Sequence, residues 1–291
     1  MRPTRLPLTG LLAIALLAAP ALAGAASPPP SPVAVSPDGP EAPSSAPTPA
    51  ASAVPIVRLG FEVVARHPHD TSAWTEGLTY DADGRLFEST GIIGRSQVRE
   101  LDPQTGAVLR SQPVPDDAYG EGLAVVGDGT LLQLTWKEGV ATAWVKDTFA
   151  VQGTFDYAGQ GEGWGLCDDG TRLVMSNGSD TLTFRDPATF GVLGAVAVTA
   201  SGHPLVNLNE LECVDGEVWA NVWETNWIVR IDPATGAVTG ALDTTGLLVP
   251  DPAEADRGAV LNGIAKVPGS DTFLVTGKLW PEMIEVRITG Q

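Results

Sequence analysis

The sequence predicts an all-β fold, a five-bladed β-propeller, and three observations support this prediction. One pattern recurs five times with spacings of 45, 43, 46 and 52 residues; its copies are Glu76-Gly77-Leu78, Glu121-Gly122-Leu123, Trp164-Gly165-Leu166, Glu210-Leu211-Glu212 and Asn262-Gly263-Ile264. A repeat of this length is typical of one four-stranded blade. Short β-rich runs bounded by turn residues fill the chain after residue 54, and no long helical period interrupts them. A TIM barrel or a Rossmann sheet is therefore disfavoured.

The first 54 residues are predicted to lie outside this domain. Residues 1–23 combine two arginines, an apolar stretch and the small-residue run Ala21-Leu22-Ala23, which indicates a secretory signal peptide. A retained transmembrane anchor is the alternative, although the stretch is short and contains two prolines. Residues 24–54 are rich in Ala, Pro and Ser and indicate a disordered linker. We therefore expect a secreted or periplasmic protein, free of the membrane after cleavage, with one propeller domain over residues 55–291.

Each repeat then follows the same order of elements. An Asp-Gly turn follows the triplet, at 83–84, 128–129, 169–170 and 215–216, and a strand follows the turn, at 86–90, 131–136, 173–177 and 218–223. Asp-Gly between apolar runs indicates a hairpin, because Gly accepts the positive φ of tight turns. A second turn of the type Asp-Pro-x-Thr, at 102–106, 186–189 and 232–236, indicates a connection between outer strands. Segment 57–65 is predicted to pair with 283–288, because this pairing would close the ring of blades.

Charge and cysteine content limit the partners and the compartment. The formal net charge is −18, and no basic cluster offsets it, so nucleic acid and anionic lipid are excluded as expected partners. The two cysteines, Cys167 and Cys213, occupy nearly matching places in adjacent repeats. A disulfide between neighbouring blades is possible in an oxidising compartment, and two separately buried thiols are the alternative.

Equivalent positions of successive repeats are expected to form rings around one mouth of the propeller axis. The first ring contains Glu76, Glu121, Trp164, Asn209 with Glu210, and Asn262. The second ring contains Gly91, Trp136, Gly178, Trp223 and Lys278. Aromatic walls with a few polar groups are the usual construction of a small-molecule site. For Glu210 and Glu212 we expect a structural role instead, in which each carboxylate accepts hydrogen bonds from a neighbouring blade.

Other chemistries lack their motifs. The chain contains no HExxH, no CxxC and no GxSxG, and His67 and His69 have no third ligand nearby in the sequence. The glycine-rich stretch 161–165 introduces a strand and lacks the lysine and helix of a phosphate loop, so we interpret it as a connection between blades. We expect a site that needs no metal and no organic cofactor.

Long segments of this chain resemble the glutamine cyclotransferase family, the plant and bacterial type of glutaminyl-peptide cyclotransferase. They are WTEGLTY at 74–80, LFESTGIIGRSQVRELDPQTG at 86–106, YGEGLA at 119–124, LTWKEG at 134–139, GWGLCDDG at 163–170, NLNELECVDGEVWANVWETN at 207–226, LNGIA at 261–265 and TGKLWPEMIEV at 276–286. The resemblance implies a five-bladed propeller that cyclises N-terminal glutamine to pyroglutamate with loss of ammonia. Peptides or proteins with N-terminal glutamine are the implied substrates, and we expect a monomer.

The resemblance also implies roles for individual residues. The family's acid/base glutamate falls on Glu121, and its pocket residues fall on Trp74, Glu76, Tyr119, Trp136, Trp164, Asn209, Trp223 and Lys278. The family usually has Gln where this chain has Glu76, and commonly has Phe where Tyr119 stands. A carboxylate at position 76 is expected to raise the pKa of a neighbouring carboxyl group.

These residues suggest a mechanism and leave two alternatives. Glu121 would move the proton from the substrate's amine to the departing nitrogen, while the tryptophans fold the glutamine side chain toward its own amine. Asn209 would bind the substrate's amide, and Lys278 would either stabilise charge on the γ-oxygen or orient Glu121. One alternative is a non-catalytic envelope propeller that binds peptide or carbohydrate. The other is a lactonase-like propeller with calcium, which the lysine at position 278 disfavours because calcium sites collect oxygen ligands.

Overall fold

A computed structural model describes residues 54–248 and 252–290, and this part of the chain is all-β apart from one helical turn. The predicted signal peptide at 1–23 and all but the last residue of the predicted linker at 24–54 lie outside the described residues. Of the helices in the described part, none is both long and apolar enough to cross a membrane.

Three sheets of four antiparallel strands follow one another along the chain, each in sequential strand order. The first contains β2 (Thr75–Tyr80), β3 (Leu86–Thr90), β4 (Gln97–Leu101) and β5 (Val108–Pro113). The second contains β6 (Gly120–Val126), β7 (Thr130–Thr135), β8 (Val140–Val145) and β9 (Val151–Asp156). The third contains β10 (Leu166–Asp168), β11 (Leu173–Met175), β12 (Thr181–Arg185) and β13 (Val192–Ala197).

The remaining long strands form one sheet of eight, in the order β16-β17-β18-β19-β1-β22-β21-β20. Its members are β16 (Leu208–Val214), β17 (Glu217–Val222), β18 (Trp227–Ile231), β19 (Val238–Asp243), β1 (Val57–Pro68), β20 (Leu261–Lys266), β21 (Thr272–Gly277) and β22 (Glu282–Thr289). β1 pairs in parallel with β19 at residues 57–59 and antiparallel with β22 from Gly60 to Pro68. The predicted pairing of 57–65 with 283–288 is confirmed. The added pairing with β19 was not predicted, and it joins two four-stranded units into one sheet.

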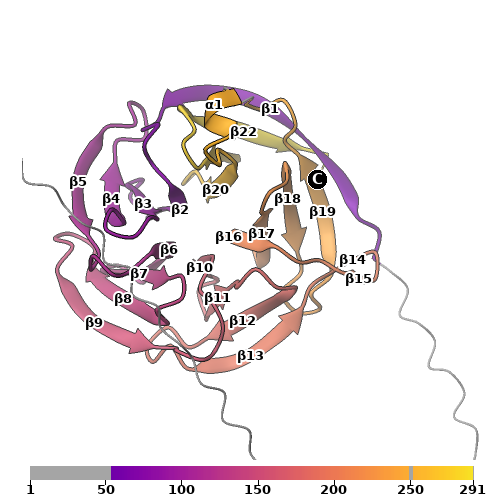
Figure 1. Ribbon diagram of the computed structural model, residues 1–291. Coiled ribbons are helices and arrows are strands. Elements are labelled where there is room, and N and C mark those ends of the chain that lie inside the picture. The colour runs from indigo at the N-terminus through magenta and orange to yellow at the C-terminus, as the bar shows by residue number, and fades with distance from the viewer. Residues whose placement is uncertain (1–53, 249–251, 291) are drawn as a thin grey trace, which may run out of the picture. The chain divides into compact units, whose positions relative to one another are not determined.

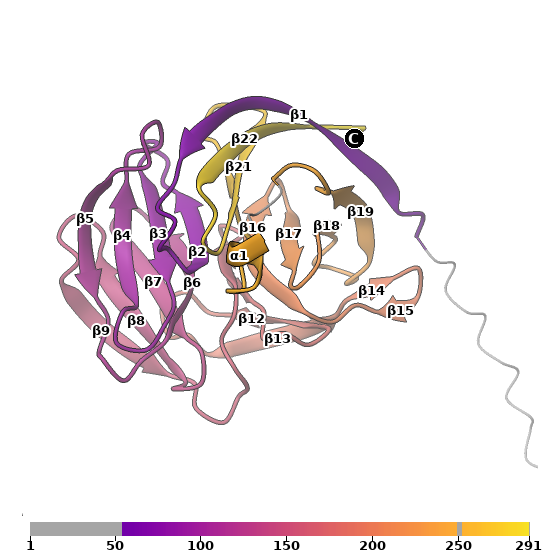
Figure 2. The same cartoon turned by 45° about the horizontal axis from the view of Figure 1, so that its top comes forward.

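Two smaller elements lie outside these sheets. β14 (Thr199–Ala200) and β15 (His203–Pro204) form a short hairpin, and α1 (Pro252–Ala255) is a four-residue helix in the connection from β19 to β20 (Figures 1 and 2). This connection accounts for the longer final interval of the repeat. After α1 the chain passes Trp74, whose ring lies 2.8 Å from where a Cβ on Gly258 would stand.

The sheets are arranged around a central axis, with the first strand of each four-stranded unit innermost (Figure 1). β2 contacts β6, β6 contacts β10, β10 contacts β16, β16 contacts β20, and β20 contacts β2. The glycine of the repeated triplet permits this approach: a Cβ on Gly122 would stand 2.5 Å from the carbonyl oxygen of Trp164, and one on Gly165 would stand 2.1 Å from that of Asn209. Any larger residue would push the inner strands apart.

Two glutamates on β16 tie the inner strands together, as predicted. The carboxylate of Glu210 on β16 accepts the backbone N–H of Leu78 at 3.2 Å and that of Ile264 at 2.8 Å, so it joins β16 to β2 and β20. Glu212 accepts the backbone N–H of Lys266 at 2.9 Å. Burial raises the pKa of Glu212 to about 8 and that of Glu210 well above its ordinary value.

The Asp-Gly turns are confirmed at three of four places. Gly84, Gly170 and Gly216 have φ between 82° and 85°. At 128–129 the prediction is wrong in detail, because the residue with positive φ is Gly127, at 57°. In the second type of turn, the side chain of Asp102 accepts the backbone N–H groups of Gln104 and Thr105, which replaces hydrogen bonds that the strand ends lose.

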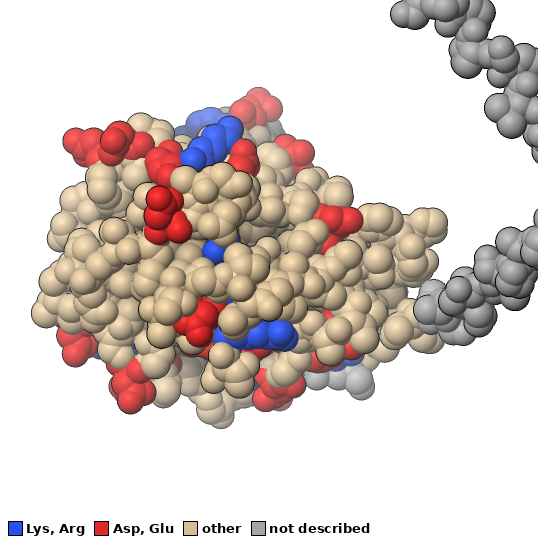
Figure 3. All heavy atoms as spheres, turned by 90° about the horizontal axis from the view of Figure 1, so that it is seen from below, with Lys and Arg blue, Asp and Glu red and all other residues tan. Residues whose placement is uncertain are grey.

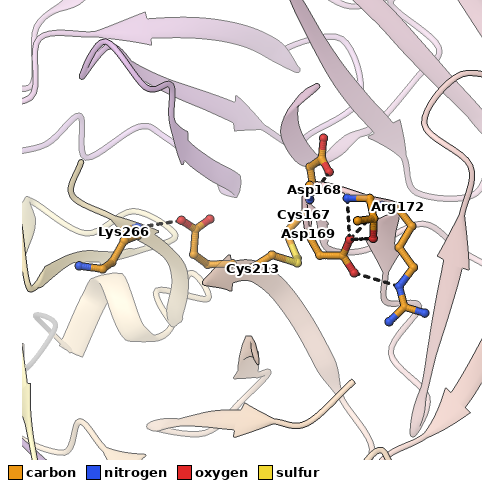
Figure 4. The surroundings of a disulfide bond; sticks show 9 residues. Cys167, Asp168, Asp169, Arg172, Cys213 and Lys266 are labelled. Atoms are coloured by element: carbon orange, nitrogen blue, oxygen red, sulfur yellow. Dashed lines mark hydrogen bonds and ion pairs between the residues drawn. A yellow bond between two sulfur atoms is a disulfide. The ribbon is translucent and has the colours of Figure 1, made fainter. Parts of the chain in front are cut away.

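A disulfide joins Cys167 on β10 to Cys213 on β16, with 5.5 Å between the Cα atoms (Figure 4). It links two adjacent inner strands from different sheets, and an Asp169–Arg172 ion pair of 2.9 Å lies beside it. Acidic side chains are spread over the face shown in Figure 3, which carries no continuous basic patch. This distribution agrees with the net charge of −18.

Candidate active site

Irregularities in the inner strands set the direction of the side chains at one mouth of the axis. The register of β2 shifts between Thr75 and Gly77, that of β6 between Gly120 and Leu123, that of β16 between Leu208 and Leu211, and that of β20 between Leu261 and Ile264. The residues inside these shifts include Glu76, Glu121, Asn209 and Asn262. A bulge leaves such residues out of the regular ladder and turns their side chains, a device that is common beside active sites.

A cavity of about 160 Å³ opens at this mouth. It is lined by all nine residues predicted from sequence, namely Trp74, Glu76, Tyr119, Glu121, Trp136, Trp164, Asn209, Trp223 and Lys278. The polar residues stand on the inner strands or just after β21, and the aromatic residues stand at strand ends. Seven of these residues were placed at this mouth by the repeat, and Trp74 and Tyr119 came from the family resemblance. The role of each residue in binding or catalysis stays a prediction.

Glu76 is the centre of the polar contacts in this cavity. Its side chain is buried, and its Oε2 lies 2.6 Å from Lys278 Nζ. The Tyr119 hydroxyl donates to its Oε1 at 2.9 Å, and Asn262 Nδ2 donates to Oε2 at 3.4 Å. We expected Lys278 to act on the γ-oxygen or to orient Glu121, but its direct partner is Glu76. The difference arises because the bulge in β2 turns the Glu76 carboxylate toward the end of β21.

Glu121 is 6% exposed and lies beside Glu76. Burial, the negative charge of Glu76 and a hydrogen bond with its carboxyl group raise the pKa of Glu121 well above its ordinary value. Lys278 acts in the opposite direction, and the charge of Glu162 adds to the increase. The expected effect of a carboxylate at position 76 on a neighbouring pKa is confirmed in direction. Burial and the negative charges of Glu76 and Glu121 also raise the pKa of Tyr119.

Aromatic rings form the walls of the cavity. The Trp164 and Trp223 rings meet edge to face with centroids 5.4 Å apart, and Tyr119 and Trp136 lie 5.5 Å apart. Two glycines of the predicted second ring hold these rings close to the backbone. A Cβ on Gly91 would stand 2.4 Å from the Tyr119 ring, and a Cβ on Gly178 would stand 2.6 Å from the Trp164 ring. These two glycines are therefore supports for the walls and not lining residues.

Asn209 brings an unused hydrogen-bonding atom to the cavity. The residue is 3% exposed, and its Oδ1 has no partner among the described residues. A buried acceptor without a partner costs free energy, so a ligand that donates a hydrogen bond to it gains correspondingly.

Glu162 also contacts the walls of the cavity, and the sequence did not lead us to predict this role. Glu162 Oε2 accepts the indole N–H of Trp136 at 2.7 Å and that of Trp164 at 3.0 Å. It belongs to the glycine-rich stretch 161–165, which we interpreted as a connection between blades. The sequence signal that could have indicated this role is a carboxylate two positions before Trp164, a predicted wall residue. Among the described residues, no group of three or more His, Cys, Asp or Glu side chains is placed to hold a metal ion.

Comparison with known proteins identifies the family. Residues 41–288 match the family described as glutamine cyclotransferase. The chain belongs to this family. The resemblance noted in the sequence is thereby confirmed, and it extends over nearly all of the described residues.

Two relatives show how closely this family member follows known proteins. It is 38% identical over 229 residues to the glutaminyl-peptide cyclotransferase of Arabidopsis thaliana. The matched region covers 78% of this chain and 71% of the plant protein. The crystal structure of Myxococcus xanthus glutaminyl cyclase matches with a TM-score of 0.73 and 39% identity. That match covers 80% of this chain and 98% of the bacterial one.

Proposed function

We propose that this protein is a glutaminyl-peptide cyclotransferase, which converts the N-terminal glutamine of peptides or proteins to pyroglutamate and releases ammonia. One observation carries the proposal: in a chain of the glutamine cyclotransferase family, an aromatic-walled cavity holds a buried glutamate, Glu121, whose pKa is raised. The names of the plant and bacterial relatives support the same activity.

The raised pKa of Glu121 suits both proton transfers of the reaction. An α-amino group has a pKa of about 7.7–8.0, so a carboxyl group with a strongly raised pKa exchanges a proton with it at little cost in free energy. We propose that Glu121 takes a proton from the α-amine as the new N–C bond forms. It then returns that proton to the γ-nitrogen as the C–N bond breaks and ammonia leaves. Glu121 ends the cycle in the protonation state in which it began.

The walls and the polar groups would hold the substrate in the reactive conformation. Trp136, Trp164 and Trp223 would fold the flexible side chain so that the amine approaches its own γ-carbonyl, and such positioning supplies much of the acceleration of an intramolecular step. The free Oδ1 of Asn209 would accept an N–H of the substrate. The 2.6 Å contact of Lys278 with Glu76 supports an indirect role, in which Lys278 holds the Glu76 charge in place beside Glu121.

The activity test uses a peptide that begins with glutamine and a matched peptide whose N-terminal amine is acetylated. Purified protein should convert the first to a product that lacks one ammonia by mass spectrometry and should leave the second unchanged, because the acetylated amine cannot attack. The same assay separates catalysis from the binding-only alternative. If the protein binds the first peptide and never converts it, the proposed function is wrong.

We also infer that the fold is a five-bladed propeller, counting the eight-stranded sheet as two blades joined through β1. Export to the periplasm or the exterior, and a monomeric state, remain proposals. The predicted leader at 1–23 supports export, and so does the disulfide between Cys167 and Cys213, since such bonds persist in oxidising compartments. The N-terminal sequence of the exported protein and its molar mass in solution test these proposals.

A further inference from the structure

Glu162 joins two walls of the cavity through a single oxygen atom. Trp136 follows β7 of one sheet, and Trp164 precedes β10 of the next sheet, yet both indole N–H groups donate to Glu162 Oε2, at 2.7 and 3.0 Å. Glu162 itself does not line the cavity. Its hydrogen bonds fix the two indoles relative to each other across the boundary between the sheets.

The surroundings of Glu162 keep its carboxylate charged. Although burial acts to raise its pKa, the hydrogen bonds from Trp164 and Trp136 and the charge of Lys137 hold it below the ordinary value. Lys137 Nζ lies 3.5 Å from Glu162 Oε1 and 3.6 Å from the centre of the Trp136 ring. The glutamate side chain is 37% exposed, so water screens part of this interaction.

We propose that Glu162 is a positioning residue for the cyclisation, which holds the indoles of Trp136 and Trp164 as a wall against the substrate and adds to the negative charge around Glu121. This inference deepens the proposed function and rests on it. Nothing requires Glu162 to touch the substrate, because it acts through the two rings and through its charge.

The electrostatic part of the role depends on the charged and titratable groups that face Glu121. In the described part of the chain they include Glu76, Lys278, Glu162, Tyr119 and Tyr157. The negative charge of Glu162 disfavours the ionised form of Glu121, so its removal is expected to lower the pKa of Glu121 and to move the acid limb of the pH–rate profile downward.

Two substitutions separate the charge from the hydrogen bonds. Glu162→Gln removes the charge but keeps a carbonyl oxygen that can accept an indole N–H. It should move the acid limb to lower pH, while the plateau rate stays within about threefold of the original. Glu162→Ala removes both; besides the same shift, kcat/KM at the plateau should fall about tenfold or more, the scale of losing hydrogen bonds to a charged group. Glu62→Gln, the same change on the outer strand β1, should alter neither.

A readout without substrate keeps this inference distinct from the proposed function. In protein labelled with ¹⁵N-tryptophan, the indole N–H signals of Trp136 and Trp164, assigned from Trp→Phe variants, should move upfield together in Glu162→Gln and further in Glu162→Ala at neutral pH. If these signals move as expected in a protein that never cyclises glutamine, the proposed function fails while the positioning of the two indoles by Glu162 stands. Unchanged signals, or a folded Glu162→Ala variant with an unchanged pH profile and unchanged kcat/KM, would overturn the positioning role.

Discussion

Replacement of Glu76 by glutamine tests the electrostatics of the site most directly. Glu76→Gln removes the negative charge that raises the pKa of Glu121, and it leaves the positive charge of Lys278 without its 2.6 Å partner. Both changes favour the ionised form of Glu121. The pKa of Glu121 should therefore fall, and the acid limb of the pH–rate profile should move to lower pH.

The size of the shift follows from Coulomb's law. Two unit charges about 4 Å apart interact by about 4 kcal/mol at an effective dielectric constant of ~20. At 1.36 kcal/mol per pKa unit this is a ceiling of about three units, and we expect a shift of about one to three. Substantial activity should remain, because glutamine keeps the shape of the side chain and can still accept the hydrogen bond from the Tyr119 hydroxyl.

The assay is kcat/KM against pH with one Gln-peptide for both enzymes. The ionisation of the substrate's amine then contributes the same limb to each profile, and the difference between the profiles belongs to the enzyme. Glu212→Gln serves as a matched control, since this half-buried carboxyl group contacts the Lys266 backbone and does not line the cavity. An acid limb that stays in place in a folded Glu76→Gln variant would refute this account of the site. Thermal unfolding of each variant checks the fold, because breaking a buried ion pair can cost about 3–5 kcal/mol.

Three further predictions address the remaining parts of the molecule. Glu121→Gln should lower kcat by about a hundredfold or more, the scale of losing a general acid/base, while circular dichroism stays unchanged; near-normal turnover would remove Glu121 from the chemistry. Prolonged dialysis against EDTA should leave turnover unchanged, and an activity that is lost and then restored by zinc or calcium would favour a metal-dependent site. Cys167→Ser should destabilise the protein by up to ~4 kcal/mol in the chain-entropy description for a 46-residue separation, and denaturant unfolding with and without reductant would show no such loss if the bond contributes nothing.

The spacing of the repeat determined where the cavity residues would meet. In a ring of similar units, equivalent positions of successive repeats stand at the same height around one axis, so Glu76, Glu121 and Trp164 become neighbours in space although they are more than forty residues apart in sequence. The repeat also made the glycine of the triplet evident in the sequence. Only the structure shows why glycine stands there: Gly122 permits the close approach of neighbouring inner strands.

Tertiary structure alone decided which polar groups pair. Lys278 stands 202 positions from Glu76 in the sequence, and only the bulge in β2 and the end of β21 show that they form an ion pair while Glu121 stays beside it with a raised pKa. The contacts of Glu162 likewise depend on the tertiary structure. Glu162 lies in a connecting loop, and its two indole partners come from two different sheets. Periodicity in a sequence specifies which residues share a level of the ring. The direction of each side chain depends instead on local irregularities of the strands, and these irregularities determine which charged groups surround Glu121.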